Sequence, residues 1–171
     1  TLLAWAWSES VPNWSVKGKK IIITGGSSGI GLATAELLAK QGAAAITIIA
    51  RDQKKIDQAV PLIKQANSAT EVYSISADVS QQAPVQAACE KAVQMMKGLD
   101  CVICSAGASY PSLFIATEEK EFERLMQINY TGIVYTLKTC VPHLIRNGGG
   151  RILLVSSMAG LSGIAGFTAY S

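Results

Sequence analysis

Short apolar runs alternate with longer segments of mixed polarity from residue 19 onward. The apolar runs are rich in β-branched residues and predict five strands, over residues 19–24, 45–50, 71–78, 100–107 and 151–157. The segments between them carry apolar residues at helical spacing and predict four helices, over residues 29–42, 52–67, 80–98 and 117–150. Strands that alternate with helices are typical of parallel sheets.

Three of the predicted strands are apolar throughout instead of alternating apolar with polar positions. The runs IIIT, ITIIA and ILLV lie within residues 19–24, 45–50 and 151–157. Such runs indicate strands that are covered on both faces, as in a parallel sheet with helices on each side. With right-handed crossovers, the pattern predicts an α/β fold, a doubly wound parallel sheet in three Rossmann-like α/β/α layers.

The ends of the predicted helices carry the residues expected there. Asp52 and Ser80 stand just before the second and third helices, where their side chains can cap free backbone N–H groups. Glycine stops three helices, at Gly42, at Gly98 and at residues 148–150.

Length and composition fit one folded domain. The chain has 171 residues, of which 49% are hydrophobic and 16% charged, and this composition argues against disorder. Its net charge of +3 comes from scattered Lys and Arg residues, so we expect no nucleic-acid partner. The strand and helix pattern places this domain at residues 19–171. No apolar run approaches the roughly 20 residues of a membrane span.

The N-terminal segment, residues 1–18, contains all three tryptophans: Trp5, Trp7 and Trp14. Tryptophan favours membrane interfaces, so this segment is either flexible or the remnant that follows a membrane anchor. Membrane association through a segment before residue 1 therefore stays open.

The cysteines favour a structural role. Cys101 and Cys104 form a C-x-x-C pattern, which suggests a redox pair or metal ligands. They fall on a predicted strand, however, where positions i and i+3 point to opposite faces. We therefore expect buried, separate thiols and no metal site.

A glycine-rich loop joins the first strand to the first helix. The sequence TGGSSGIG spans residues 24–31, where glycines allow a tight turn and a close approach of a pyrophosphate to the backbone. The helix N-terminus adds free N–H groups and a favourable dipole. The expected contacts to a dinucleotide are Gly25, Ser27, Ser28, Gly29, Ile30 and Gly31.

Two further positions address the adenosine end of that cofactor. Arg51 follows the second strand, where an arginine accommodates a 2′-phosphate and an acidic residue would bind a 2′-hydroxyl. Asp52 is better explained as a helix cap than as an acidic residue that binds the 2′-hydroxyl. The pattern therefore predicts NADPH in preference to NADH. Asp78, followed by Val79, could accept from the adenine amino group or could serve only to form a turn.

Together these motifs resemble the short-chain dehydrogenase/reductase family of the Ser–Tyr–Lys type. The resemblance covers residues 19–171 and rests on the loop at 24–31, Asp78-Val79, Ala106-Gly107, Asn129, and Ser157 thirteen residues before Tyr170. It implies that Ala106 and Gly107 contact the cofactor. It also implies that the full-length protein is a homo-oligomer.

The resemblance implies a hydride transfer from NADPH to a ketone. Tyr170 would donate the proton, Ser157 would hydrogen-bond the carbonyl oxygen, and Asn129 would position a water in the proton relay. Residues 122–135 and 155–171 are most similar to members that reduce the 3-keto group of long-chain sphingoid bases at the cytosolic face of the endoplasmic reticulum. Another lipid or steroid ketone is the alternative substrate.

The chain departs from the family pattern in two places. Ser105 stands where the family has asparagine, so it is expected to support the sheet less well. The family lysine, four positions after the tyrosine, would lie beyond Ser171. We therefore expect a C-terminally truncated chain that binds a dinucleotide but is inactive alone.

Apolar residues follow the fourth and fifth predicted strands, at the sheet edge where doubly wound folds bind ligands. They suit a pocket for a lipid-like ketone, although loops also use such residues to plug the core. The candidates are Leu113, Phe114, Met158, Leu161, Ile164 and Phe167.

Overall fold

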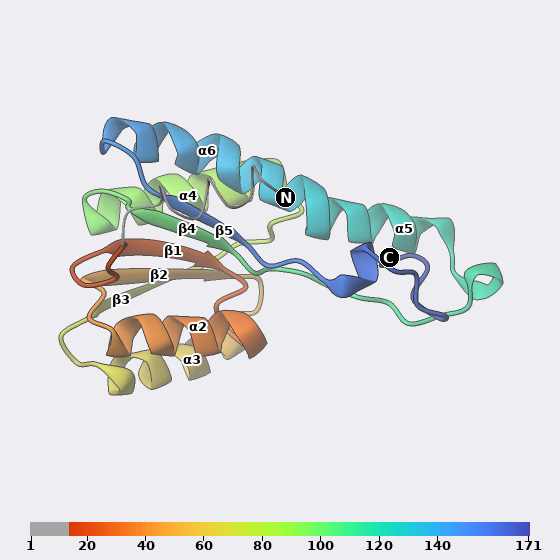
Figure 1. Cartoon of the computed structure of the whole chain (residues 1–171), viewed down its shortest axis with the longest axis horizontal. Coiled ribbons are helices and arrows are strands. Elements are labelled where there is room, and N and C mark those ends of the chain that lie inside the picture. The colour runs from red at the N-terminus through yellow and green to blue at the C-terminus, as the bar shows by residue number, and fades with distance from the viewer. Residues whose placement is uncertain (1–13) are drawn as a thin grey trace, which may run out of the picture.

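Five parallel strands form one sheet in the order β3-β2-β1-β4-β5 (Figure 1). The computed structural model describes residues 14–171, so the predictions made for residues 1–13 lie outside the described part. The strands are β1 (Lys20–Thr24), β2 (Ala45–Ala50), β3 (Glu71–Ser76), β4 (Cys101–Cys104) and β5 (Arg151–Leu154). All five predicted strands are present, and the predicted doubly wound parallel sheet is confirmed.

Helices cover both faces of the sheet (Figure 1). One layer contains α2 (Gly29–Lys40) and α3 (Gln53–Ala66), and the other contains α4 (Gln82–Met96) and α6 (Gly132–Arg146). The helix predicted over 117–150 begins as α5 (Glu119–Met126) and reaches α6 through one wide π-helical turn, η2 (Gln127–Thr131). Within residues 14–171, none of the helices combines the length and apolarity needed to cross a bilayer.

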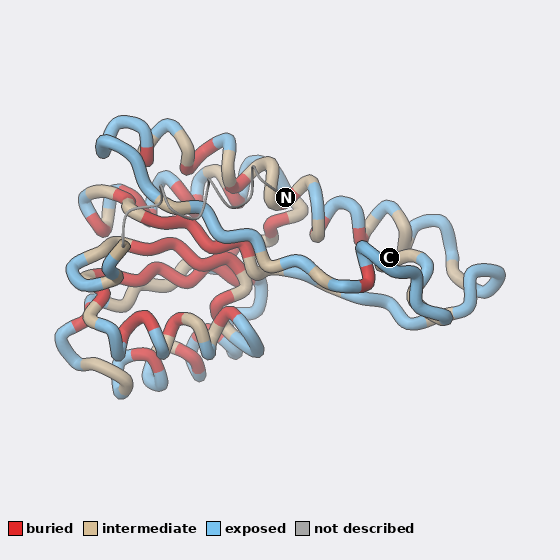
Figure 2. Tube along the Cα trace, in the orientation of Figure 1, coloured by how far each residue is buried: buried red, intermediate tan, exposed pale blue. Residues whose placement is uncertain are grey.

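Two separate apolar cores explain the uninterrupted apolar runs of the strands. Ile22 faces α4 and α6, whereas its neighbours Ile21 and Ile23 face α2 and α3. All three side chains are fully buried, and Figure 2 shows the buried trace along the central strands. Trp14 and Val16 pack against the core on the α2 side, so contacts with the domain begin before residue 19.

The C-x-x-C pair is divided between these cores. Cys104 lies in the core under α4 and α6, and Cys101 lies in the opposite one, as the strand periodicity predicted. Burial raises the pKa of the Cys101 thiol to about 11 and that of Cys104 to about 12, so both stay protonated and apolar.

The fifth strand forms an edge of the sheet. Ile152, Leu153 and Leu154 are each about half exposed, at 45%, 51% and 49%. Beyond β5, the chain continues into an arm that lies beside α5 and carries the C-terminus (Figures 1 and 2).

One of the two predicted helix caps is confirmed and the other is wrong. Asp52 accepts hydrogen bonds from the N–H groups of Lys54 and Lys55 at the start of α3. Ser80 does not cap α4, which begins two residues later, at Gln82, with Gln81 in the capping position. The Ser80 hydroxyl instead donates to the Asp78 carboxylate at 2.7 Å, because that charged acceptor lies within reach in the same turn.

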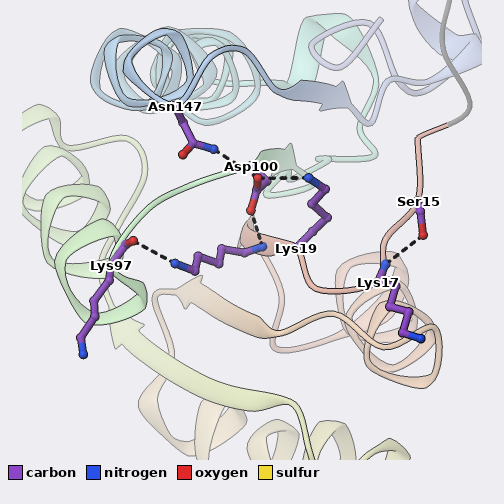
Figure 3. A network of polar contacts seen from close by, with 7 residues as sticks. Ser15, Lys17, Lys19, Lys97, Asp100 and Asn147 are labelled. Carbon is purple, nitrogen blue, oxygen red and sulfur yellow. Dashed lines mark hydrogen bonds and ion pairs between the residues drawn. The ribbon is translucent and has the colours of Figure 1, made fainter.

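A partly buried aspartate joins four elements at the amino end of the sheet (Figure 3). Asp100, just before β4, accepts from the Lys20 backbone N–H at 2.9 Å and from the Asn147 amide at 3.2 Å, and it pairs with Lys19 at 3.4 Å. Its own carbonyl accepts from the N–H of Arg151, which begins β5. These contacts hold β1, β4, β5 and the end of α6 in register, on the side opposite the glycine-rich loop.

Replacing Thr47 with Val should stabilise the protein. The Thr47 hydroxyl is buried in β2 and finds no hydrogen-bond partner within residues 14–171. Valine has the same shape as threonine but lacks the hydroxyl. Removing this unpaired buried hydroxyl should raise the free energy of unfolding by about 1 kcal/mol, measured by chemical denaturation. Thr70→Val is the matched control, because the buried Thr70 hydroxyl donates to the Ala43 carbonyl at 2.8 Å and its loss should destabilise. Equal effects of the two substitutions would contradict this prediction.

Candidate active site

The glycine-rich loop packs tightly against the neighbouring strand ends. Gly25 has φ +71°, and a Cβ there would lie 2.7 Å from backbone atoms of Ala106 after β4. A Cβ on Gly31, in the first turn of α2, would lie 2.3 Å from the Gly25 carbonyl oxygen. Gly26 was not among the predicted site residues, yet its Cβ would lie 2.6 Å from the Ile48 side chain. The doubled glycine of TGG was the signal for this contact with β2.

The backbone at the start of α2 is open, as a phosphate-binding loop requires. Apart from its chain neighbours and its own helix backbone, a Cβ on Gly29 would meet no atom of residues 14–171 within 4 Å, so the backbone there faces open space. Ser28 precedes the helix without a side-chain capping bond to the described residues, which leaves its hydroxyl and the first N–H groups free to donate. Ile30 is also exposed, at 65%, beside this space. The loop therefore presents donors and a positive helix end where the sequence predicted phosphate contacts.

Arg51 and Asp78 lie together at the carboxyl ends of β2 and β3. The Arg51 guanidinium is 3.7 Å from Asp78 Oδ2, and their side chains are 73% and 31% exposed. Burial alone would raise the pKa of Asp78, but hydrogen bonds from Ser80 and the Arg51 charge outweigh it and hold the pKa below its ordinary value. Asp78 is therefore ionised at neutral pH, and Arg51 keeps a largely exposed face for an anion.

Asn129 connects the π-helical turn to the strand-end loop after β4. Its Oδ1 accepts from the Ala108 N–H at 2.9 Å, and its amide donates to the Ala108 carbonyl at 2.9 Å. Gly107 lies against the same side chain, because a Cβ there would be 3.4 Å from Asn129 Oδ1. The structure thus brings together the predicted residues Gly25, Ala106, Gly107 and Asn129. The hydrogen bonds of Asn129 position the loop at Ala108. The predicted role of Asn129 in holding a water stays a prediction.

Ser157 and Tyr170 both lie in the segment after β5. The Ser157 hydroxyl accepts from the Ala159 N–H at 3.1 Å and caps the short helix η3 (Met158–Gly160). The half-buried Tyr170 ring packs edge-on against Phe167, with centroids 6.3 Å apart. Within the described residues, no hydrogen bond joins the Ser157 and Tyr170 hydroxyls, so their joint action is a prediction from spacing.

The apolar candidates for a substrate pocket occupy two loops that contact each other. The Ser112 N–H donates to the Gly166 carbonyl at 2.7 Å, which joins the loop after β4 to the segment after β5. Phe114, in the short helix η1 (Phe114–Ala116), packs edge-on against Phe122 of α5. Five of the six candidates are at least half exposed: Leu113, Phe114, Met158, Leu161 and Ile164. Phe167 is half-buried.

A separate groove of about 820 Å³ lies between the start of α4 and α5. Its lining includes Gln81, Lys120, Phe122 and Met126, and none of the six predicted pocket residues contributes to it. The groove therefore does not support the predicted substrate pocket.

Comparison with known proteins defines the class. The family model described as short chain dehydrogenase matches residues 19–171. The chain therefore belongs to the short-chain dehydrogenase family, and this membership indicates a nicotinamide dinucleotide cofactor.

Two curated relatives and one solved structure illustrate the similarity. The chain is 36% identical to 3-ketodihydrosphingosine reductase of Dictyostelium discoideum, over 92% of this chain and 52% of the relative. It is 39% identical to the Bos taurus protein of the same name, over 92% of this chain and 48% of the relative. The NAD+-bound xylitol dehydrogenase structure superposes with a TM-score of 0.86 at 28% identity and covers 92% of this chain and 60% of that one. The chain thus spans about half the length of these curated relatives.

Proposed function

We propose that the full-length protein reduces the 3-keto group of 3-ketodihydrosphingosine with NADPH, a step of sphingolipid biosynthesis. The observation that carries the proposal is the 36% and 39% identity to two relatives that bear the name of this activity. The apolar loops after β4 and β5 support it, because a long-chain ketone needs an apolar surface beside the cofactor.

The bound nicotinamide would supply the hydride, and residues of this chain would deliver the proton. Tyr170 donates the proton to the developing alkoxide, and Ser157 hydrogen-bonds the carbonyl oxygen. A phenol with an ordinary pKa of about 10 is a weak acid at neutral pH, so it needs a neighbouring cation. Asn129 holds the loop at Ala108 and, through the π-helical turn, positions a water toward that cation.

The substrate assay separates this proposal from its neighbours. The full-length protein should oxidise NADPH faster with 3-ketodihydrosphingosine than with a short-chain ketone or a steroid ketone. Faster turnover of the steroid would favour the alternative lipid or steroid reductase.

Residues that follow Ser171 test the non-catalytic alternative, because the proposal requires a lysine four positions after Tyr170. Any other residue there would leave a dinucleotide-binding module without catalysis.

Arg51→Ala should weaken NADPH binding without a matching loss of NADH binding. The exposed guanidinium lies at the end of β2, where it can bind the 2′-phosphate that NADH lacks. A charge-assisted contact of this kind corresponds to about a tenfold rise in the NADPH dissociation constant. Cofactor fluorescence titration of the full-length protein checks this, with Lys54→Ala, another cation at the start of α3, as the control. Equal losses for both cofactors would mean that Arg51 does not select NADPH.

The proposal extends to location and partners. A sphingoid substrate resides in membranes, so we place the full-length protein at the cytosolic face of the endoplasmic reticulum. It would associate with the membrane through a segment before residue 1 and act as a homo-oligomer. Fractionation of cells that express the full-length protein tests the location, and recovery in a soluble fraction would contradict it.

A further inference from the structure

The Asp78 side chain is held from two sides by groups with different functions. Ser80 donates to Asp78 Oδ1 twice, from its backbone N–H at 3.0 Å and from its hydroxyl at 2.7 Å. The other oxygen, Oδ2, faces the Arg51 guanidinium at 3.7 Å. A carboxylate has about four acceptor positions, so Oδ2 retains one beyond Arg51. The three residues therefore form a chain of contacts from the start of the α4 region to the end of β2.

We propose that Ser80 is a positioning residue for cofactor selection, which orients the Asp78 carboxylate so that Asp78 in turn holds Arg51 toward the 2′-phosphate of NADPH. This inference rests on the proposed function, since it requires that Arg51 contacts that phosphate. Ser80 touches neither the cofactor nor the substrate in this arrangement and acts through Asp78.

The turn that carries Ser80 is itself fixed in place. Val79, between Asp78 and Ser80, is 8% exposed and lies in the core under α4 and α6. Gly132 packs against it, because a Cβ there would lie 3.0 Å from the Val79 carbonyl. The Gln81 N–H closes the turn by donating to the Asp78 carbonyl at 3.1 Å. A rigid turn gives the Ser80 hydroxyl a defined direction, so its bond can set the carboxylate rotamer.

Arg51 is also constrained at its backbone. The Ser76 hydroxyl donates to the Arg51 carbonyl at 3.1 Å, which ties the end of β2 to the end of β3. The long Arg51 side chain, in contrast, has only the Asp78 contact to restrict it among the interactions of residues 14–171. Exposed ion pairs are weak when both partners move, and they strengthen when one partner is held. Ser80 supplies that restraint, and the ionised state of Asp78 preserves the attraction.

A double-mutant cycle in the full-length protein tests the chain of contacts. The dissociation constants of NADPH and NADH are measured for Ser80→Ala, Arg51→Ala and the double variant. Ser80→Ala should raise the NADPH constant about fivefold, which corresponds to one hydrogen bond, and the NADH constant by less. In the Arg51→Ala background, the same substitution should affect NADPH no more than NADH. Ser80→Thr keeps the hydroxyl and should restore selectivity.

Each other result overturns a specific claim. If Arg51→Ala lowers selectivity for NADPH but Ser80→Ala weakens both cofactors equally, the positioning role of Ser80 is wrong and the role of Arg51 stands. If Arg51→Ala itself leaves the selectivity for NADPH unchanged, the proposal that Arg51 binds the 2′-phosphate is wrong. Ser68→Ala, an exposed serine between α3 and β3, is the matched control and should change neither constant. Thermal unfolding of Ser80→Thr and Ser80→Ala separates misfolding from a change in selectivity.

Discussion

Replacing Tyr170 with Phe should lower the rate of ketone reduction by the full-length protein by about 10²- to 10⁴-fold, the range of a lost proton donor. The substitution removes only the phenolic oxygen. The ring contact with Phe167, at 6.3 Å between centroids, is retained by phenylalanine, so the segment after β5 should keep its packing. The NADPH dissociation constant should therefore stay within about twofold of the original, since no cofactor contact is assigned to this residue.

The control for this substitution is Tyr73→Phe. Tyr73 lies on the edge strand β3, where its hydroxyl donates to Glu71, far in the sheet order from β5. Its loss should leave the rate of ketone reduction unchanged. A Tyr170→Phe variant that retains more than half of the original rate, measured as NADPH oxidation, would show that the proton comes from another group. The thirteen-residue spacing from Ser157 would then have misidentified the acid.

The sheet and its helices could be predicted because each depends on local pattern. Uninterrupted runs such as residues 45–50 are apolar on both faces, and the structure buries all six residues of β2. Asp52 could also be predicted as a cap, because its acceptor and the N–H groups of Lys54 and Lys55 are close in the chain.

The prediction for Ser80 was wrong because its hydroxyl has two possible local partners. A serine before a helix can accept from the helix N–H groups or donate to a nearby side chain. The charged Asp78, two residues earlier, offers the stronger hydrogen bond, and the sequence alone does not rank the two arrangements. The start of α4 consequently lies at Gln82.

The contacts of Asn129 illustrate what tertiary structure decides. Asparagine is a poor helix former, so its place in a long helix marked a special position. Its partner Ala108 lies 21 residues earlier, on a loop whose course depends on the sheet. The same holds for the apolar loops: their location after β4 and β5 was predictable, whereas the bond between Ser112 and Gly166 that joins them was not.

Two physical effects predict opposite changes in stability for the substitution Gly31→Ala. In an exposed helix, Gly→Ala normally stabilises a protein by roughly 0.5–1 kcal/mol, because alanine loses less conformational entropy. Gly31 is buried in the first turn of α2, and a Cβ there would lie 2.3 Å from the carbonyl oxygen of Gly25 and 2.8 Å from its carbonyl carbon. Both atoms belong to the backbone, so no side-chain rotation can relieve the overlap. The loop over residues 24–31 would have to move.

Gly31→Ala should therefore destabilise the full-length protein by about 1–3 kcal/mol, as overpacking does, and raise the NADPH dissociation constant by more than about tenfold. NADPH binding is expected to be affected most, because the displaced loop carries the N–H groups that are predicted to bind the pyrophosphate. Chemical denaturation and fluorescence titration measure the two effects. Gly163→Ala is the control, since a Cβ there meets no atom of residues 14–171 within 4 Å apart from its chain neighbours. A Gly31→Ala variant that is more stable and binds NADPH normally would show that helix propensity outweighs the contact with Gly25, and that the loop tolerates displacement.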